Sequence, residues 1–252
     1  MRMNEYLGPS GAKVSLYPSK AGKAVILICP GGGYQFLAPR EAEPVANAFL
    51  AAGYHAAILH YSVYRGEALK TLPLTQAAWA VSLLRSKLGL PVYVCGFSAG
   101  AHLCASLAVH ADTLTEQFPG CKPDGSILCY PVISAGKFAH RDSIYRLTHG
   151  DADLTDFFCL ENHITSQTPP AFLWHTADDE TVPVQNTLLY SGALAEQQVP
   201  CEVHIFPHGV HGLSLATPEV DEPEKGRIAD PYVARWLDLC LRWLDARQSG
   251  RQ

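Results

Sequence analysis

Short apolar runs recur along the chain, and each is followed by a longer stretch whose apolar residues have helical spacing. The runs that predict strands cover 24–29, 56–61, 92–95, 126–130, 171–175 and 202–206. The stretches that predict helices cover 41–52, 75–88, 99–111, 186–198 and 232–247. Gly53, Gly89 and Pro200 stand at the ends of three of them, where glycine and proline terminate helices. This alternation predicts an α/β fold with a mostly parallel central sheet and helices on both faces.

The longest stretch without a clean period lies between the predicted strands 126–130 and 171–175. Unstructured segments of this length inside a compact domain usually serve function. We therefore expect residues 134–168 to form a small lid over an active site. At 252 residues the chain fits one α/β domain, so we expect a single domain over 1–252.

Composition and charge limit the classes of molecule that the protein is expected to bind. With 48% hydrophobic and 17% charged residues the chain is a compact globule, and its net charge of −5 supplies no positive field for nucleic acid or anionic lipid. No apolar stretch reaches membrane-spanning length, and the first residues lack the apolar run of a secretory signal. The eight cysteines form no CxxC pair. They predict buried thiols in a reducing cytoplasm, with no disulfide frame or zinc site. The composition, charge and cysteine content are also compatible with an oligomer.

Residues 96–100 read Gly-Phe-Ser-Ala-Gly and lie between a predicted strand and a predicted helix. Small residues on both sides of Ser98 allow a sharp turn that exposes its hydroxyl at a helix N-terminus, where developing negative charge is favoured. The five-residue match alone is common by chance, and an inert serine in an ordinary turn is the alternative. The flanking strand and helix favour Ser98 as a nucleophile.

A glycine run, Gly31-Gly32-Gly33, follows the first predicted strand. Successive glycines let backbone N–H groups point at one spot, as an oxyanion hole requires. A phosphate cradle or a plain hinge would also use such a run, but the Lys-Ser/Thr of a nucleotide loop and the spaced dinucleotide fingerprint are absent. We expect the amides of Gly32, Gly33 and Ala99 to be the donors.

Candidate acids and bases follow the last two predicted strands. Asp178 and Asp179 come after 171–175, and either carboxylate could orient a histidine while the other caps the turn. His208 and His211 come after 202–206. A histidine is the expected general base because it titrates near neutral pH.

With these four loops the chain resembles the α/β-hydrolase superfamily, whose triads follow the order serine, acid, histidine. Within it the chain is most similar to small esterases related to hormone-sensitive lipase, in particular bacterial acetyl-xylan esterases and xylanase-associated carbohydrate esterases. Pro30 departs from the His-Gly-Gly-Gly of the lipase-like relatives. The acid-loop signature in 168–184 implies Asp179 as the catalytic acid, and Gly-x-His-Gly implies His211 as the base.

The resemblance implies a serine carboxylic-ester hydrolase that works through an acyl-enzyme and needs no metal or organic cofactor. It implies a small-molecule ester substrate, such as an acetylated sugar. An arylformamidase or a peptidase-like amide hydrolase on the same fold is the alternative. A binding protein that has lost catalysis is a third reading, which the intact serine, aspartate and histidine disfavour.

Four polar residues near strand ends or in the expected lid are candidates for substrate binding: Tyr34, Tyr64, Arg65 and His163. Ordinary loop packing explains each of them equally well. His102 and Cys104 lie close in sequence, but no third ligand has matching spacing. We therefore expect His102 to be a structural, hydrogen-bonded histidine.

Overall fold

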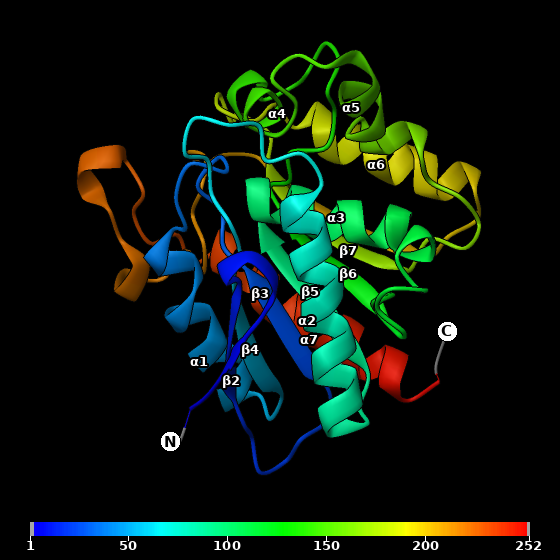
Figure 1. Cartoon of the computed structure of the whole chain (residues 1–252). Helices are drawn as coiled ribbons and strands as arrows, with labels where there is room; N and C mark the ends of the chain where they lie inside the picture. Colours follow the sequence, from blue (N-terminus) through cyan, green and yellow to red (C-terminus); the bar gives the residue numbers. More distant parts are fainter. Residues whose placement is uncertain (1–2, 251–252) are drawn as a thin grey trace.

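The computed structural model describes residues 3–250, and an eight-stranded sheet runs through its middle (Figure 1). The strand order is β1-β2-β4-β3-β5-β6-β7-β8. The strands are β1 (Asn4–Leu7), β2 (Lys13–Tyr17), β3 (Val25–Cys29), β4 (His55–His60), β5 (Val92–Phe97), β6 (Gly125–Cys129), β7 (Ala171–Thr176) and β8 (Cys201–Phe206). Strands β3 to β8 pair in parallel, so the mostly parallel sheet is confirmed. Each of its six predicted strands lies within two residues of its predicted bounds.

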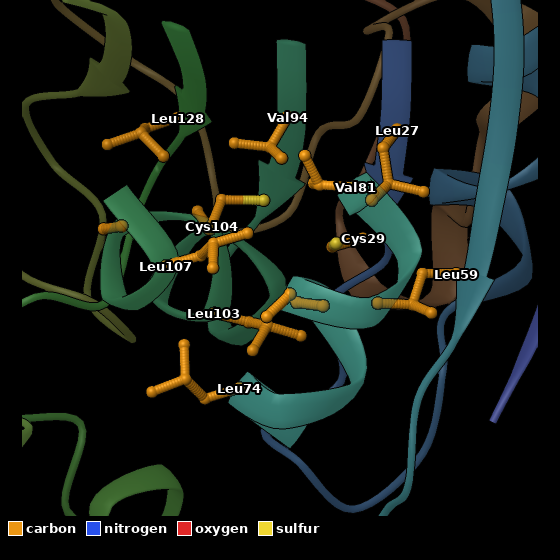
Figure 2. Packing of buried hydrophobic residues seen from close by; sticks show 14 of the residues in the cluster. Leu27, Cys29, Leu59, Leu74, Val81, Val94, Leu103, Cys104, Leu107 and Leu128 are labelled. Atoms are coloured by element: carbon orange, nitrogen blue, oxygen red, sulfur yellow. The ribbon is translucent and has the colours of Figure 1, made fainter. Parts of the chain in front are cut away.

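Helices cover both faces of the sheet, as predicted. One core is built with residues of α2 (Leu72–Leu88), α3 (Ala99–His110) and α6 (Gln185–Glu196). The other is built with residues of α1 (Glu43–Ala51) and α7 (Trp236–Gln248). In β3, Leu27 faces the first core and Ile26 the second, because successive strand side chains point to opposite faces. Figure 2 shows Leu27 among side chains of α2 and α3.

Strands β1 and β2 were absent from the sequence prediction. They pair antiparallel with each other, and β2 pairs antiparallel with β4. Strand β1 is four residues long and mostly exposed, so it carries no period-two apolar signal. Strand β2 buries Val14 and Leu16 but is only five residues long. Short, polar edge strands of this kind are stabilised by their pairing partners and not by their own pattern.

Two segments lie beyond the carboxyl ends of the strands. Residues 134–168 hold two short helices, α4 (Arg141–Thr148) and α5 (Ala152–Phe157), and a 3-10 helix, η4 (Leu160–Asn162). The second segment, which we call the 217–231 hairpin, projects to one side in orange (Figure 1). It contains η5 (Pro218–Val220) and η6 (Pro223–Lys225), and a bridge between Glu222 and Arg227 closes it. The sequence pattern did not predict this hairpin.

Four further 3-10 helices connect these elements. They are η1 (Pro9–Gly11), η2 (Pro39–Glu41), η3 (Ala111–Thr113) and η7 (Val233–Arg235). The predicted last helix, 232–247, corresponds to η7 followed by α7, and its Trp236 is fully buried in the core as expected. Within residues 3–250, none of the helices combines the length and apolarity that crossing a lipid bilayer requires.

Candidate active site

Ser98 occupies a sharp turn between β5 and α3. Its backbone has φ 53° and ψ −117°, a conformation that non-glycine residues rarely adopt. The turn requires glycine on both sides. A Cβ on Gly96 would lie 2.3 Å from the carbonyl oxygen of Gly100, and one on Gly100 would lie 2.0 Å from that of Cys29. The strained turn directs the Ser98 side chain toward the loops that follow the neighbouring strands.

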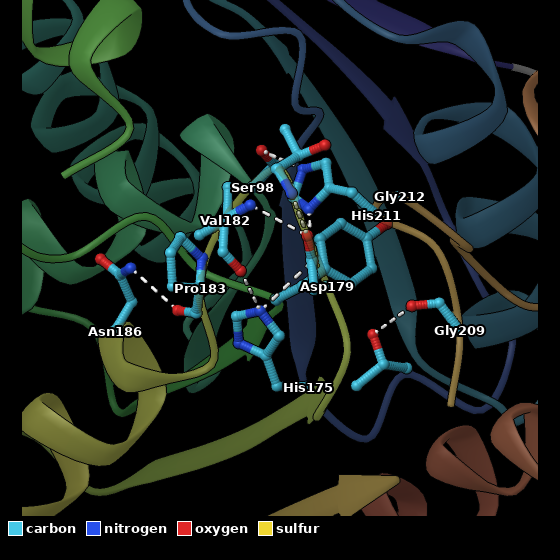
Figure 3. Close-up of polar contacts among 12 residues, drawn as sticks. Ser98, His175, Asp179, Val182, Pro183, Asn186, Gly209, His211 and Gly212 are labelled. Carbon is cyan, nitrogen blue, oxygen red and sulfur yellow. Dashed lines mark hydrogen bonds and ion pairs between the residues drawn. The ribbon is translucent and has the colours of Figure 1, made fainter. Parts of the chain in front are cut away.

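A continuous chain of hydrogen bonds runs from Ser98 through a histidine to a carboxylate (Figure 3). Ser98 Oγ lies 2.8 Å from His211 Nε2, and His211 Nδ1 lies 2.6 Å from Asp179 Oδ2. The three residues come from the loops after β5, β8 and β7, which are near neighbours in the sheet. Parallel strands place the loops at their carboxyl ends on one edge, so three distant sequence segments meet there.

Asp179 is nearly fully buried, and its carboxylate accepts several hydrogen bonds. The amides of Thr181 and Val182 each donate to Oδ1 at 2.9 Å, and His175 Nε2 lies 3.3 Å from Oδ2. Burial alone would raise the pKa of Asp179. Hydrogen bonds from His175 and His211, with the attraction of His211, outweigh burial and hold that pKa well below its ordinary value. The carboxylate is therefore ionised at neutral pH and suited to orient an imidazole.

The neighbouring Asp178 has different partners. Its Oδ2 lies 3.0 Å from His208 Nδ1, and its Oδ1 accepts a 2.8 Å hydrogen bond from the Gly209 amide. Both side chains of this pair are more than half exposed. Of the two aspartates that the sequence left open, the structure brings Asp179 to His211 and leaves Asp178 capping the turn before His211.

The glycine turn after β3 lies beside Ser98. A Cβ on Gly31 would come within 3.1 Å of the Ser98 Cβ, so the approach is close. Gly32 and Gly33 have φ values of 121° and 60°, which favour glycine. Among residues 3–250, the amides of Gly32, Gly33 and Ala99 donate to no backbone acceptor. The carbonyl of Gly33 accepts a 3.0 Å hydrogen bond from Arg146 Nη1 of α4.

A buried carboxylate braces this turn. Glu41 is 3% exposed, and its Oε2 accepts a 2.8 Å hydrogen bond from the Gly31 amide. Its Oε1 accepts from Tyr130 at 2.7 Å and from Arg40 Nη2 at 3.3 Å. The Tyr130 ring packs edge-on against His211, with ring centroids 5.1 Å apart. Glu41 thus links the glycine turn to the surroundings of the histidine.

A cavity of about 310 Å³ opens beside Ser98. Its lining combines Ser98, His211 and the glycine turn with charged and polar side chains that the sequence reading had not selected: Arg40, Glu41, His140, Arg146, Thr181, Glu222, Lys225 and Arg227. A second hollow of about 730 Å³ shares Thr181, His211, Lys225 and Arg227 with it. The 217–231 hairpin therefore forms a wall of both. Its charged composition resembles an ordinary solvent-exposed loop, so the sequence offered no signal for this position.

The four residues proposed from sequence for substrate binding lie outside this cavity. Tyr34 is buried, and its hydroxyl lies 2.9 Å from His102 Nδ1. Tyr64 contacts His149, and Arg65 points to the backbone of Tyr64. His163 Nε2 lies 2.7 Å from the carbonyl of Asp156.

His102 is fully buried. Besides its contact with Tyr34, its Nε2 lies 3.1 Å from the carbonyl of Phe158. The predicted structural histidine is therefore confirmed. Across residues 3–250, no three His, Cys, Asp or Glu side chains gather in a way that could hold a metal ion.

Several known proteins similar to this chain are hydrolases. A profile of the prolyl oligopeptidase family matches residues 148–238. Endo-1,4-beta-xylanase B of Butyrivibrio fibrisolvens is 38% identical over 210 residues, which are 77% of this chain and 33% of the xylanase. The chain thus spans about a third of the length of that relative.

Two solved structures match over nearly the whole chain. An acetyl ester-xyloside bifunctional hydrolase from Caldicellulosiruptor lactoaceticus has a TM-score of 0.82 and 36% identity, covering 97% of this chain and 90% of that one. The carboxylesterase Cest-2923 from Lactobacillus plantarum has a TM-score of 0.87 and 28% identity, with 98% of both chains covered. With its sheet order and the turn at Ser98, the chain belongs to the α/β-hydrolase superfamily, as a carboxylic-ester hydrolase similar to these two enzymes.

Proposed function

We propose that the chain hydrolyses short-chain acyl esters, above all acetyl esters, on small sugars or oligosaccharides, with Ser98, His211 and Asp179 as its catalytic triad. The observation that carries this proposal is the unbroken hydrogen-bond chain of 2.8 and 2.6 Å from the Ser98 hydroxyl to the Asp179 carboxylate. A hydroxyl is a weak nucleophile at neutral pH unless a base within hydrogen-bond reach accepts its proton. His211 meets that condition, and Asp179 fixes its tautomer.

In the proposed reaction, Ser98 Oγ attacks the ester carbonyl carbon while its proton moves to His211 Nε2. The amides of Gly32, Gly33 and Ala99 stabilise the tetrahedral oxyanion. His211 then gives the proton to the leaving alcohol oxygen, and the acyl group stays on Ser98. Water attacks this acyl-enzyme with His211 as base, which releases the carboxylic acid and restores the serine. Asp179 remains ionised throughout and stabilises the imidazolium.

The size of the cavity, about 310 Å³, supports a small substrate. Within the described part of the chain, Phe36 is the one large apolar side chain that lines it, so a long acyl chain would gain little from burial there. The neighbouring hollow is lined largely by polar and charged groups, which suit the hydroxyls of a sugar. The names of the relatives, an acetyl ester-xyloside hydrolase and a xylanase, agree with such a substrate.

The direct test compares p-nitrophenyl acetate with p-nitrophenyl palmitate, for wild type and Ser98→Ala. We expect kcat/KM for the acetate to exceed that for the palmitate at least a hundredfold, and the Ser98→Ala variant to be inactive. Acetate release from acetylated xylo-oligosaccharides tests the sugar. Equal activity of Ser98→Ala would refute the triad, and a preference for the palmitate would refute the short acyl group.

A second candidate is an amide hydrolase, because a profile of the prolyl oligopeptidase family matches residues 148–238. Esters and amides share the nucleophile, base and oxyanion donors. N-formylkynurenine and short proline-containing peptides, assayed beside the acetylated xylo-oligosaccharides, distinguish the two. Turnover of an amide above that of the acetyl ester would favour this second function.

We further propose that residues 134–168 act as a lid within a single domain and that the protein works in the cytoplasm. The contact between Arg146 of α4 and the Gly33 carbonyl supports a lid that adjoins the oxyanion amides. All eight cysteines are free thiols, six of them buried, which suits a reducing compartment. Limited proteolysis in the absence and presence of a fluorophosphonate inhibitor tests the lid, since inhibitor binding should protect 134–168.

A further inference from the structure

The 217–231 hairpin carries a carboxylate that binds three cations. Glu222 Oε2 lies 2.8 Å from Arg40 Nε and 2.5 Å from Arg227 Nη1, and its Oε1 lies 2.8 Å from Lys225 Nζ. The side chains of Arg40 and Arg227 are 11% and 23% exposed, so solvent screens these contacts less than ordinary surface ion pairs. One carboxylate, that of Glu222, therefore forms ion pairs with two largely buried arginines, Arg40 and Arg227.

Both arginines also donate to the backbone of the loop that holds His211. Arg227 Nε donates a 2.9 Å hydrogen bond to the carbonyl of His211, and Arg40 Nη2 donates to the carbonyl of Gly212. A Cβ on Gly212 would lie within about 3 Å of both guanidinium groups, so they close tightly around this residue. Two residues before His211, the carbonyl of Gly209 accepts a 2.7 Å hydrogen bond from Thr176 Oγ1.

We propose that Glu222 is a positioning residue for His211, acting through Arg227 and Arg40. The proposal rests on the proposed function, because it assigns Glu222 a part in keeping the base of the Ser98 triad in place. The hairpin fixes the carboxylate itself, since the backbones of Glu222 and Arg227 exchange hydrogen bonds of 2.8 and 3.2 Å. Arg227 and Arg40, held by this carboxylate, in turn fix the carbonyls of His211 and Gly212 through their hydrogen bonds.

Two physical effects give this arrangement a catalytic consequence. First, a small displacement of the His211 backbone lengthens its bonds to Ser98 and Asp179, and proton transfer depends steeply on such distances. Second, the two guanidinium groups beside the histidine oppose the imidazolium that forms in the transition state, and a nearby carboxylate offsets their charge. Its three cations hold the pKa of Glu222 at about 2, Lys225 being the largest contributor, so the offset persists at working pH.

The test compares Glu222→Gln, the conservative Glu222→Asp and the control Glu224→Gln in the intact chain. Glu224 lies in the same hairpin and is exposed, so its replacement leaves the cluster unchanged. For Glu222→Gln we expect kcat on p-nitrophenyl acetate to fall about tenfold with KM changed less than about twofold. Glu222→Asp should recover part of the loss, and Glu224→Gln should match wild type.

The rate of covalent labelling by a fluorophosphonate probe is the second readout, because it reports the reactivity of Ser98 without a bound sugar. It should fall by the same factor in Glu222→Gln. A variant that keeps the wild-type kcat and labelling rate and shows only a lower Tm would overturn the proposal and leave Glu222 a purely structural role. If Glu222→Gln does not fold, Arg227→Gln, which removes the donor to the His211 carbonyl, is judged by the same criteria. Absent labelling of wild type would instead refute the proposed function.

Discussion

The phenol of Tyr130 donates a 2.7 Å hydrogen bond to the buried carboxylate of Glu41, and the other carboxylate oxygen accepts the amide of Gly31. Tyr130 comes directly after β6, whereas Glu41 closes η2, so this contact joins the glycine turn to the centre of the sheet. The Tyr130 oxygen also accepts the amide of Ser214, three residues beyond His211. One buried polar pair thus connects the glycine turn beside Ser98 with the segment that follows His211.

Because of the contact between Glu41 and Tyr130, we expect Glu41→Gln to lower both stability and activity. Gly31 and Tyr130 donate to different oxygens of the carboxylate, and in the amide an NH2 group replaces one of these oxygens, so one buried donor loses its acceptor. We expect Tm to fall and kcat on p-nitrophenyl acetate to drop about tenfold, because the oxyanion amides lose their brace. The exposed Glu67→Gln variant serves as the control. Wild-type kcat in Glu41→Gln would show that the turn holds its shape without this carboxylate.

We expect substitutions of the two adjacent aspartates to have very different effects on kcat. Asp179→Asn keeps the shape of the side chain but removes the charge that fixes the His211 tautomer, so we expect kcat to fall about 10⁴-fold. Asp178→Asn alters only the exposed contacts with His208 and Gly209 and should retain kcat within about threefold. Steady-state kinetics on the acetyl ester measures both. The reverse ranking would assign the acid to Asp178.

His102 predicts how stability depends on pH. Burial lowers the pKa of His102 to about 4, and the charge of His110 adds a smaller decrease. The hydrogen bond with the Phe158 carbonyl acts in the opposite direction. In the unfolded chain the pKa is about 6.5. The unfolded state therefore binds a proton first as the pH falls, so this contribution to stability is complete above pH 6.5 and is lost toward pH 4.

The loss amounts to roughly 3 kcal/mol at most, by the linkage between pKa and stability. Urea unfolding of wild type and His102→Gln at pH 7, 6, 5 and 4 measures it. We expect the difference in unfolding free energy between the two proteins to shrink as the pH falls. A difference that stays constant over this range would contradict the lowered pKa. Burial also lowers the pKa of His110 to about 4, and this histidine is present in both proteins.

The close approach at the Ser98 turn leads us to expect opposite effects on stability for two glycine-to-alanine changes in helices. In Gly100→Ala the new methyl group would lie 2.0 Å from the carbonyl oxygen of Cys29, a fixed backbone atom. We expect a loss of about 3 kcal/mol or more in unfolding free energy, with loss of activity. In Gly192→Ala the methyl group meets nothing within 4 Å, so helix propensity should stabilise the protein by about 0.5–1 kcal/mol. Denaturant unfolding of both variants checks the pair.

The sequence predicted the parts of the molecule whose signal is local. Ser98 sits in a five-residue motif between strand and helix, and the apolar runs marked the parallel strands because both faces of that sheet are buried. Strands β1 and β2 escaped prediction since they are short and stabilised by pairing. Tyr34 was expected near substrate because it follows the glycine turn, but its left-handed backbone, with φ 58°, accompanies a side chain buried against His102.

Contacts between distant segments could not be predicted in this way. Glu222 and Arg40 are far apart in the sequence, and neither stands in a motif, so only the folded chain brings them together. The same holds for Glu41, which the helical pattern included as the first residue of a helix. Its role depends on Tyr130 and Gly31, whose separation from it no period or spacing encodes.

Helix α4 contacts the glycine turn through Arg146, which donates hydrogen bonds to the carbonyl of Gly33 and to Oε1 of Gln35. The Gly33 carbonyl shares its peptide plane with the Tyr34 amide and directly follows the Gly33 amide, so we expect a displacement of α4 to be transmitted to the glycine turn. On the proposed mechanism, a displacement of α4 that widened the entrance would also disturb the amides expected to hold the oxyanion. We therefore expect access to the cavity and reactivity of the ester to be coupled, so that a bulky substrate that displaces α4 binds at the expense of its own turnover.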